Sequence, residues 1–176
     1  MNQAQSEHLS RVRHLRESFV AANERLVSRL RGAKDDLAER GAEGSWSAAQ
    51  IGWHVATVTT RFAAMIAGDI GGPQPLPEQF RERPWAEVAA AIPPRITAPS
   101  AFTPPPSVRR ADAVAALESS AMKMARAFDG LSADRGARMG VTNATVGTIT
   151  VYQIAEWATA HIARHNRQAK RALGEG

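Results

Sequence analysis

All ten prolines of this 176-residue chain fall between Pro73 and Pro106. Proline lacks the backbone N–H that the interior of a helix requires, so a long helix cannot run through this stretch. On both sides of it, apolar residues recur at spacings of three and four, which is typical of amphipathic helices. The pattern predicts two helical halves joined by a long irregular crossover.

Four long helices and one short helix are expected. Their predicted ranges are 5–37, 47–67, 85–91, 108–129 and 150–173, and the short helix 85–91 lies inside the crossover. Two of the starts have the spacing of a capping box, in which the first and fourth residues each bond the other's backbone N–H. These two are Ser47-Ala48-Ala49-Gln50 and Thr150-Val151-Tyr152-Gln153. The glycine-containing segment 130–149 is expected to be a loop.

We therefore predict an all-α fold, a four-helix bundle with a long Pro-rich crossover between its second and third helices. A length of 176 residues favours a single domain over residues 1–176, large enough to bury a core. No apolar run approaches 18 residues, so we expect no membrane span. The first residues lack the apolar stretch of a secretory signal, and a cytoplasmic location is the resulting expectation.

Composition narrows the possible chemistry. The chain contains no cysteine, which excludes disulfides, thiolate nucleophiles and zinc–thiolate sites, so a metal site must use nitrogen and oxygen ligands. It has 22 Lys and Arg residues against 17 acidic residues, a formal net charge of +5. The basic residues are scattered beside acidic ones along the helices, which indicates a solvated surface. A nucleic-acid-binding stripe is the alternative, and we do not expect nucleic acid as a partner.

Three histidines are candidates for a common site. His161 and His165 are four residues apart on the last predicted helix, so their side chains lie on one face. His54 lies in an apolar part of the second predicted helix. Three buried neutral imidazoles would each need a partner, and one divalent cation would satisfy all three. The alternatives are a hydrogen-bonded core histidine at position 54 and a structural pair at positions 161 and 165.

The remaining histidines, His8 and His14, are six residues apart on the first predicted helix. Residues six apart point to different faces of a helix, so we expect both side chains to be solvent-exposed and leave them out of the site. Residue 162 is Ile, whereas the zinc metalloprotease motif places a Glu general base between its two histidines. This difference excludes a metalloprotease of that type.

A series of short motifs resembles the DinB-like family of metalloenzymes, which is related to bundles of the mycothiol-dependent maleylpyruvate isomerase type. In chain order these motifs are Trp46-Ser47, Gln50, His54, His161-xxx-His165 and Gln168. The resemblance covers nearly the whole chain in its order of helices. It implies that His54, His161 and His165 bind a divalent metal, zinc or nickel, and that the protein is a homodimer. Relatives often carry Glu at the position of Gln50, so this chain has one negative charge fewer there.

Three imidazoles on one cation leave coordination positions for water or substrate, as in catalytic sites. Because the chain has no cysteine, a thiol would have to come from a small molecule, and the resemblance implies a low-molecular-weight thiol as co-substrate. We therefore expect a divalent-metal-dependent enzyme, a transferase of the small-thiol S-transferase type or a hydrolase. A non-catalytic metal- or small-ligand-binding bundle is the alternative.

Three further residues are candidates for the surroundings of the metal. Gln50 precedes His54 by one turn, Trp157 precedes His161 by one turn, and Arg61 follows His54 by two turns. Gln50 could bond near the metal, Trp157 could form a wall of the pocket, and Arg61 could meet an anionic substrate. Each also has a structural interpretation: a helix cap for Gln50, core packing for Trp157 and a solvated side chain for Arg61.

Overall fold

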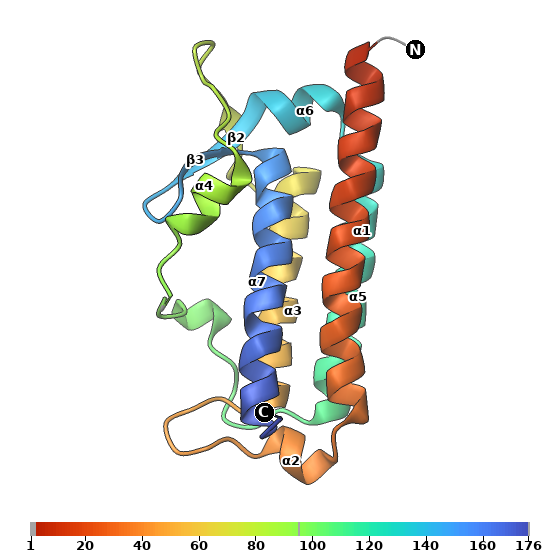
Figure 1. The fold of residues 1–176 in the computed structure, drawn as a ribbon, viewed down its shortest axis with the longest axis vertical. Helices are drawn as coiled ribbons and strands as arrows, with labels where there is room; N and C mark the ends of the chain where they lie inside the picture. The colour runs from red at the N-terminus through yellow and green to blue at the C-terminus, as the bar shows by residue number, and fades with distance from the viewer. Residues whose placement is uncertain (1–2, 95, 176) are drawn as a thin grey trace.

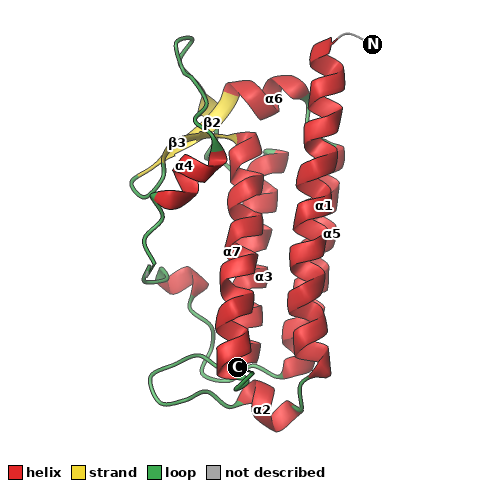
Figure 2. Ribbon diagram, in the orientation of Figure 1, coloured by secondary structure: helices red, strands yellow, loops and turns green. Residues whose placement is uncertain are grey.

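The computed structural model describes residues 3–94 and 96–175. Four long helices pack side by side as a bundle (Figures 1 and 2). They are α1 (Gln3–Gly32), α3 (Ala48–Ala67), α5 (Arg110–Asp129) and α7 (Val151–Ala172). Helix α3 contacts α5 and α7, and α1 contacts the same two helices. The prediction of a mainly α-helical bundle is confirmed.

Both predicted capping boxes are present, and they begin the two helices that carry the candidate histidines. Ser47 Oγ accepts a hydrogen bond from the Gln50 N–H at 3.1 Å, and Gln50 Oε1 accepts one from the Ser47 N–H at 2.9 Å. Thr150 and Gln153 form the same pair of bonds, both at 3.2 Å. These bonds satisfy backbone N–H groups that have no partner inside the helix, so they fix where α3 and α7 begin.

The first predicted helix, 5–37, is wrong at its C-terminal end. Helix α1 ends at Gly32, and a separate short helix, α2 (Asp35–Glu39), follows it. Glycine is a weak helix former, and Lys34 has an extended backbone, with φ −71° and ψ 146°. Asp35 and Asp36 then place negative charge in the first turn of α2, where the helix dipole favours it.

The predicted loop 130–149 is also wrong, because it contains regular structure. It contains helix α6 (Ala133–Arg138) and strands β2 (Met139–Asn143) and β3 (Gly147–Thr150). Strand β1 (Gln74–Pro75), from the crossover, completes an antiparallel sheet of order β1-β2-β3. A Cβ on Gly140 would lie 2.2 Å from the Ile149 carbonyl oxygen, so glycine permits the close approach of β2 to β3.

The crossover between α3 and α5 contains β1, the short helix α4 (Trp85–Ala90) and a single 3-10 turn, η1 (Ser100–Phe102). The predicted short helix at 85–91 is confirmed as α4. Figure 1 shows the crossover descending beside α7, and α4 contacts α7 while η1 contacts α3. The Pro-rich segment is therefore packed along the two helices that carry the candidate histidines.

The core is a single cluster of buried apolar side chains to which all four long helices contribute. Among its largest fully buried members are Phe19, Leu26, Leu30, Ile51, Ile66, Leu117, Met124, Ile154 and Ile162. Gly52 lets α3 approach its neighbours, because a Cβ there would lie 2.7 Å from Leu30 and 3.3 Å from Ala113. In the described part of the chain, no helix has the length and apolar character needed to cross a bilayer.

Candidate metal centre

The structure brings His54, His161 and His165 together between α3 and α7. One ring nitrogen from each histidine lies within 4.8 Å of the corresponding nitrogens of the other two. The ring centroids are 4.4 Å apart for His161 and His165, 4.7 Å for His54 and His165, and 5.2 Å for His54 and His161. The capping boxes that set the starts of α3 and α7 thus also set the positions of the three rings along the helices.

Hydrogen bonds fix the proton positions on two of the rings. His54 Nδ1 lies 2.7 Å from the Phe102 carbonyl oxygen, and His165 Nδ1 lies 2.8 Å from Gln168 Oε1. Both oxygens only accept, so each Nδ1 carries the proton and donates it. The Nε2 atoms of His54 and His165 therefore keep their lone pairs, which is the form in which imidazole binds a metal.

His161 has the least satisfied ring of the three. Its Nε2 lies 3.3 Å from His54 Nε2, and its Nδ1 is buried without a hydrogen-bond partner among the described residues. A buried polar atom without a partner costs about 1–3 kcal/mol. Such a group in a native structure calls for an explanation, and an ion is one of the explanations it can have.

All three histidines are held in the neutral state. Burial lowers the pKa of His161 well below its ordinary value, and the neighbouring His165 and His54 lower it further. Burial, followed by the charge of His54, lowers the pKa of His165 to about 4. Burial also lowers the pKa of His54, against the effect of the bond to the Phe102 carbonyl. At neutral pH the site therefore offers uncharged nitrogen donors, which a divalent cation requires.

The donor set fits a metal ion. Neutral imidazoles suit zinc, nickel, copper and iron, and oxygen acceptors already orient two of the three rings. Within residues 3–94 and 96–175, this is the only group of three or more His, Asp or Glu side chains close enough to share an ion.

The structure gives different positions to the other three candidates. Gln50 uses its amide in the capping box and in bonds to the crossover, where Nε2 donates to the carbonyls of Pro105 and Pro106 at 2.8 and 3.1 Å. Its polar atoms are therefore already engaged away from the imidazoles. Arg61 is exposed.

Trp157 lies beside the histidine cluster with one ring between them. The half-buried indole of Trp157 is 5.5 Å from the Phe62 ring, and the Phe62 ring is 6.4 Å from that of His161. The Trp46 ring is 5.0 Å from that of His54. Aromatic side chains therefore border the cluster at His54 and at His161, and Phe62 separates Trp157 from His161.

Sequence reasoning missed two contacts between the crossover and the helices that carry the histidines. The Phe102 carbonyl, which orients His54, belongs to the crossover. Arg164, on α7, donates from Nη1 to the Pro93 carbonyl at 3.1 Å and from Nη2 to the Pro94 carbonyl at 2.7 Å. The available signal was the proline content, since a Pro-rich segment has few N–H groups and presents mainly carbonyl acceptors.

The expectation that His8 is exposed is wrong. It is buried, and its Nδ1 lies 2.6 Å from the Tyr152 hydroxyl. The Arg11 guanidinium lies 4.3 Å from the centre of the Tyr152 ring. The expectation that His14 is exposed is confirmed. A hollow of about 430 Å³ is lined by His8, Arg11 and Tyr152, near the start of α7 and away from the three-histidine cluster.

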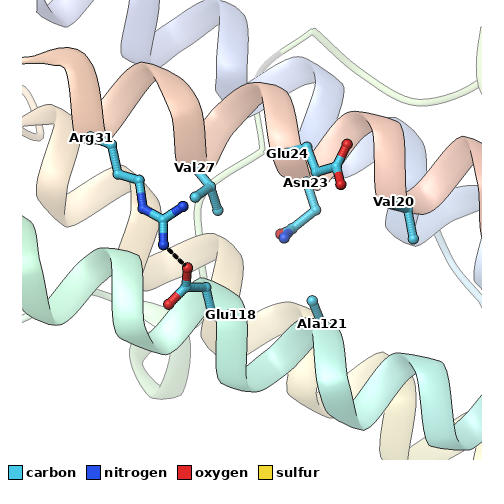
Figure 3. Close-up of a pocket in the computed structure, with 7 residues that line it drawn as sticks. All are labelled: Val20, Asn23, Glu24, Val27, Arg31, Glu118 and Ala121. Atoms are coloured by element: carbon cyan, nitrogen blue, oxygen red, sulfur yellow. Dashed lines mark hydrogen bonds and ion pairs between the residues drawn. The ribbon is translucent and has the colours of Figure 1, made fainter.

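A second hollow, of about 300 Å³, lies between α1 and α5 (Figure 3). Val20, Val27 and Ala121 provide apolar walls, and an ion pair between Arg31 and Glu118 spans one end. The hollow lacks a set of converging nitrogen or carboxylate ligands, so it does not compete with the histidines as a metal centre.

A model of the DinB superfamily matches residues 18–169. The chain belongs to the DinB superfamily. The matched region of this DinB superfamily member contains His54, His161 and His165, the whole crossover, all of α3 and α5, the second half of α1 and most of α7. The family prediction made from the sequence motifs is confirmed. A comparison with curated proteins finds no match.

Proposed function

We propose that this DinB superfamily member is a divalent-metal-dependent enzyme that acts on small molecules. The proposed reaction is transfer involving a low-molecular-weight thiol, with hydrolysis as the second possibility for the same site. The observation that carries the proposal is the convergence of three neutral, buried imidazoles, two of which have their Nδ1 protons fixed outward. Zinc and nickel are the proposed metals, because both accept imidazole ligands.

In this proposal, His54, His161 and His165 hold the ion. A bound divalent cation would lower the pKa of a water or thiol ligand and so supply a nucleophile at neutral pH. The Phe102 carbonyl and Gln168 Oε1 keep the Nδ1 protons in place, which maintains the orientation of the His54 and His165 rings. Because the protein has no cysteine, the thiol belongs to the substrate.

The surroundings support a small and partly apolar substrate. Trp46 and Phe62 border the histidine cluster, and the crossover is bonded to the same region through the Phe102 carbonyl. Aromatic walls exclude water, which strengthens electrostatic interactions inside a site. The alternative of a non-catalytic metal-binding bundle has one observation in its favour: the cluster contains no carboxylate to act as a general base.

Elemental analysis of protein purified without chelator tests the proposal. We expect about one zinc or nickel ion per chain. His161→Ala should lose the ion, while His14→Ala, which changes an exposed histidine, should keep it. Wild-type protein that is isolated without metal and takes up neither zinc nor nickel would contradict the proposal.

Activity screening separates the two functional alternatives. Metal-loaded protein is incubated with small thiols and electrophiles, and loss of free thiol is measured. Thiol consumption that requires His161 supports the transferase. Stoichiometric metal binding without turnover of thiols or esters favours the non-catalytic bundle.

We also propose that the protein is a homodimer. Val20 on α1 and Met122 on α5 are apolar side chains that remain 42% and 58% exposed. Light scattering should give twice the chain mass of 18.9 kDa, and the mass of one chain would contradict the proposal.

A further inference from the structure

The hollow between α1 and α5 contains an acceptor that no described residue satisfies (Figure 3). Asn23 is only 6% exposed, and its Oδ1 is buried without a hydrogen-bond partner in the described part of the chain. The Asn23 carboxamide projects from α1 into the hollow, across from Ala121 of α5. A buried amide oxygen is normally hydrogen-bonded, so a donor is missing at this point of the hollow.

The charges that line the hollow favour a cation. Glu24 lines it and forms no ion pair or hydrogen bond with a described residue. Arg31 is the one cation among the described lining residues, and it is already paired with Glu118. The Glu24 carboxylate and the Asn23 amide oxygen therefore both lack a donor, and apolar walls lie beside them. An arginine or lysine side chain, which carries a cation on an aliphatic stem, fits this combination.

The same face of the bundle presents an arginine that has no acidic partner. Glu118, Met122 and Arg126 are spaced four residues apart, so they run along one side of α5 from the edge of the hollow. Met122 is 58% exposed, and Arg126 is exposed and forms no ion pair or side-chain hydrogen bond within residues 3–94 and 96–175. Arg16 and Arg31, by contrast, each pair with a carboxylate of α5. A hollow that accepts a cation and an unpaired cation on one face are self-complementary, as a twofold dimer requires.

We infer that two copies of the chain meet at the hollow between α1 and α5, and that Arg126 of each copy inserts into the hollow of the other. The guanidinium donates to Asn23 Oδ1 and to the Glu24 carboxylate, and its aliphatic stem packs on the apolar walls. In a twofold dimer the two insertions form together. The inference rests on the proposed homodimer, because it names the surface through which the two copies associate.

Charge reversal at the two ends of the contact tests the inference. Light scattering over a range of protein concentrations measures the dissociation constant of the dimer. Arg126→Glu and Glu24→Arg should each raise this constant by about tenfold or more, because each change places like charges together at both contacts of the dimer. An equimolar mixture of the two variants should regain twice the chain mass of 18.9 kDa. In such a mixed dimer, opposite charges meet at both contacts.

Arg25→Glu is the matched control. Arg25 is exposed and lies two residues after Asn23, so it points to the opposite side of α1, and its reversal should leave the dissociation constant unchanged.

The outcomes separate the inference from the proposed homodimer. A wild type that stays monomeric would contradict the homodimer and, with it, the inference. A dimeric wild type whose dissociation constant is unchanged in Arg126→Glu would overturn the inference alone. If Arg126→Glu fails to fold, an unchanged constant in Glu24→Arg is equally decisive. Two weakened variants whose mixture stays monomeric would also overturn the inference, because their charges would then not meet across the dimer.

Discussion

His161 is the residue whose surroundings make least sense without an ion. Its Nδ1 has no partner among the described residues, and its Nε2 faces another imidazole. His54 and His165, in contrast, each have an oxygen acceptor at Nδ1. The spacing of His161 and His165 could be predicted from the sequence, because it follows from helix geometry. The acceptor of His54 Nδ1 and the unpartnered Nδ1 of His161 could not be predicted, because they depend on how separate segments pack.

His161→Ala should abolish stabilisation by metal. A ligand that binds only the folded state stabilises it by about 2.7 kcal/mol at a concentration of 100 Kd. We expect zinc to raise the melting temperature of the wild type and to leave that of His161→Ala unchanged, as measured by differential scanning calorimetry. The same zinc-dependent rise in both proteins would show that His161 is not a ligand.

Gln168→Ala should weaken metal binding without removing a ligand. It deletes the acceptor of His165 Nδ1, and loss of a hydrogen-bond partner that orients a metal ligand typically costs 10–100-fold in metal affinity. Gln168→Glu keeps an acceptor at this position and should retain the affinity. Competition titration with a zinc-binding dye measures the difference, and equal affinities of the wild type and Gln168→Ala would be inconsistent with the role given to Gln168.

The metal-free protein should lose stability as the pH falls from about 6.5 to about 4. His165 has a pKa of about 4 in the folded state, against an ordinary value of 6.5. Between these values the unfolded chain binds the proton and the folded chain does not, so acid favours unfolding. The stabilisation from His165 is fully present above pH 6.5, and its loss is complete below about pH 4. Urea unfolding across this range should show that the free energy of unfolding depends less steeply on pH in His165→Ala than in the wild type. The same pH dependence in both proteins would contradict the assignment of the low pKa to His165.

At the scale of elements, the parts set by local chemistry could be predicted and those set by distant contacts could not. The capping boxes at Ser47 and Thr150 correctly predicted the starts of α3 and α7. The three-stranded sheet was missed because its strands are short and one of them, β1, comes from the crossover. The role of the crossover was missed for the same reason: its carbonyls reach donors on α3 and α7 that lie far away in the sequence.

Removing the two caps should have unequal costs. Ser47→Ala should lower the free energy of unfolding by about 1 kcal/mol, the usual value for loss of an N-cap. Thr150→Ala should cost more, because the Thr150 hydroxyl also donates to Glu82 at 2.9 Å. Chemical denaturation measures both values. Ser28→Ala, which changes an exposed serine, is the control and should leave the free energy of unfolding nearly unchanged. A smaller cost for Thr150→Ala than for Ser47→Ala would contradict this account.

At the scale of the whole molecule, the bundle and the crossover form the candidate metal centre together. The bundle supplies three imidazoles from α3 and α7, and the crossover supplies the carbonyl that orients one of them. The crossover is attached next to the site by further bonds, from Gln50 to Pro105 and Pro106 and from Arg164 to Pro93 and Pro94. Residues more than 100 positions apart in the chain thus meet at one centre.

X-ray absorption spectroscopy of the zinc-loaded protein tests this account most directly, because it reports the atoms that surround the ion. We expect scattering from three imidazole rings in the wild type, and no bound zinc in His161→Ala. A zinc environment without imidazole scattering would contradict the assignment of the ion to these histidines. An unchanged spectrum in His161→Ala would contradict it as well.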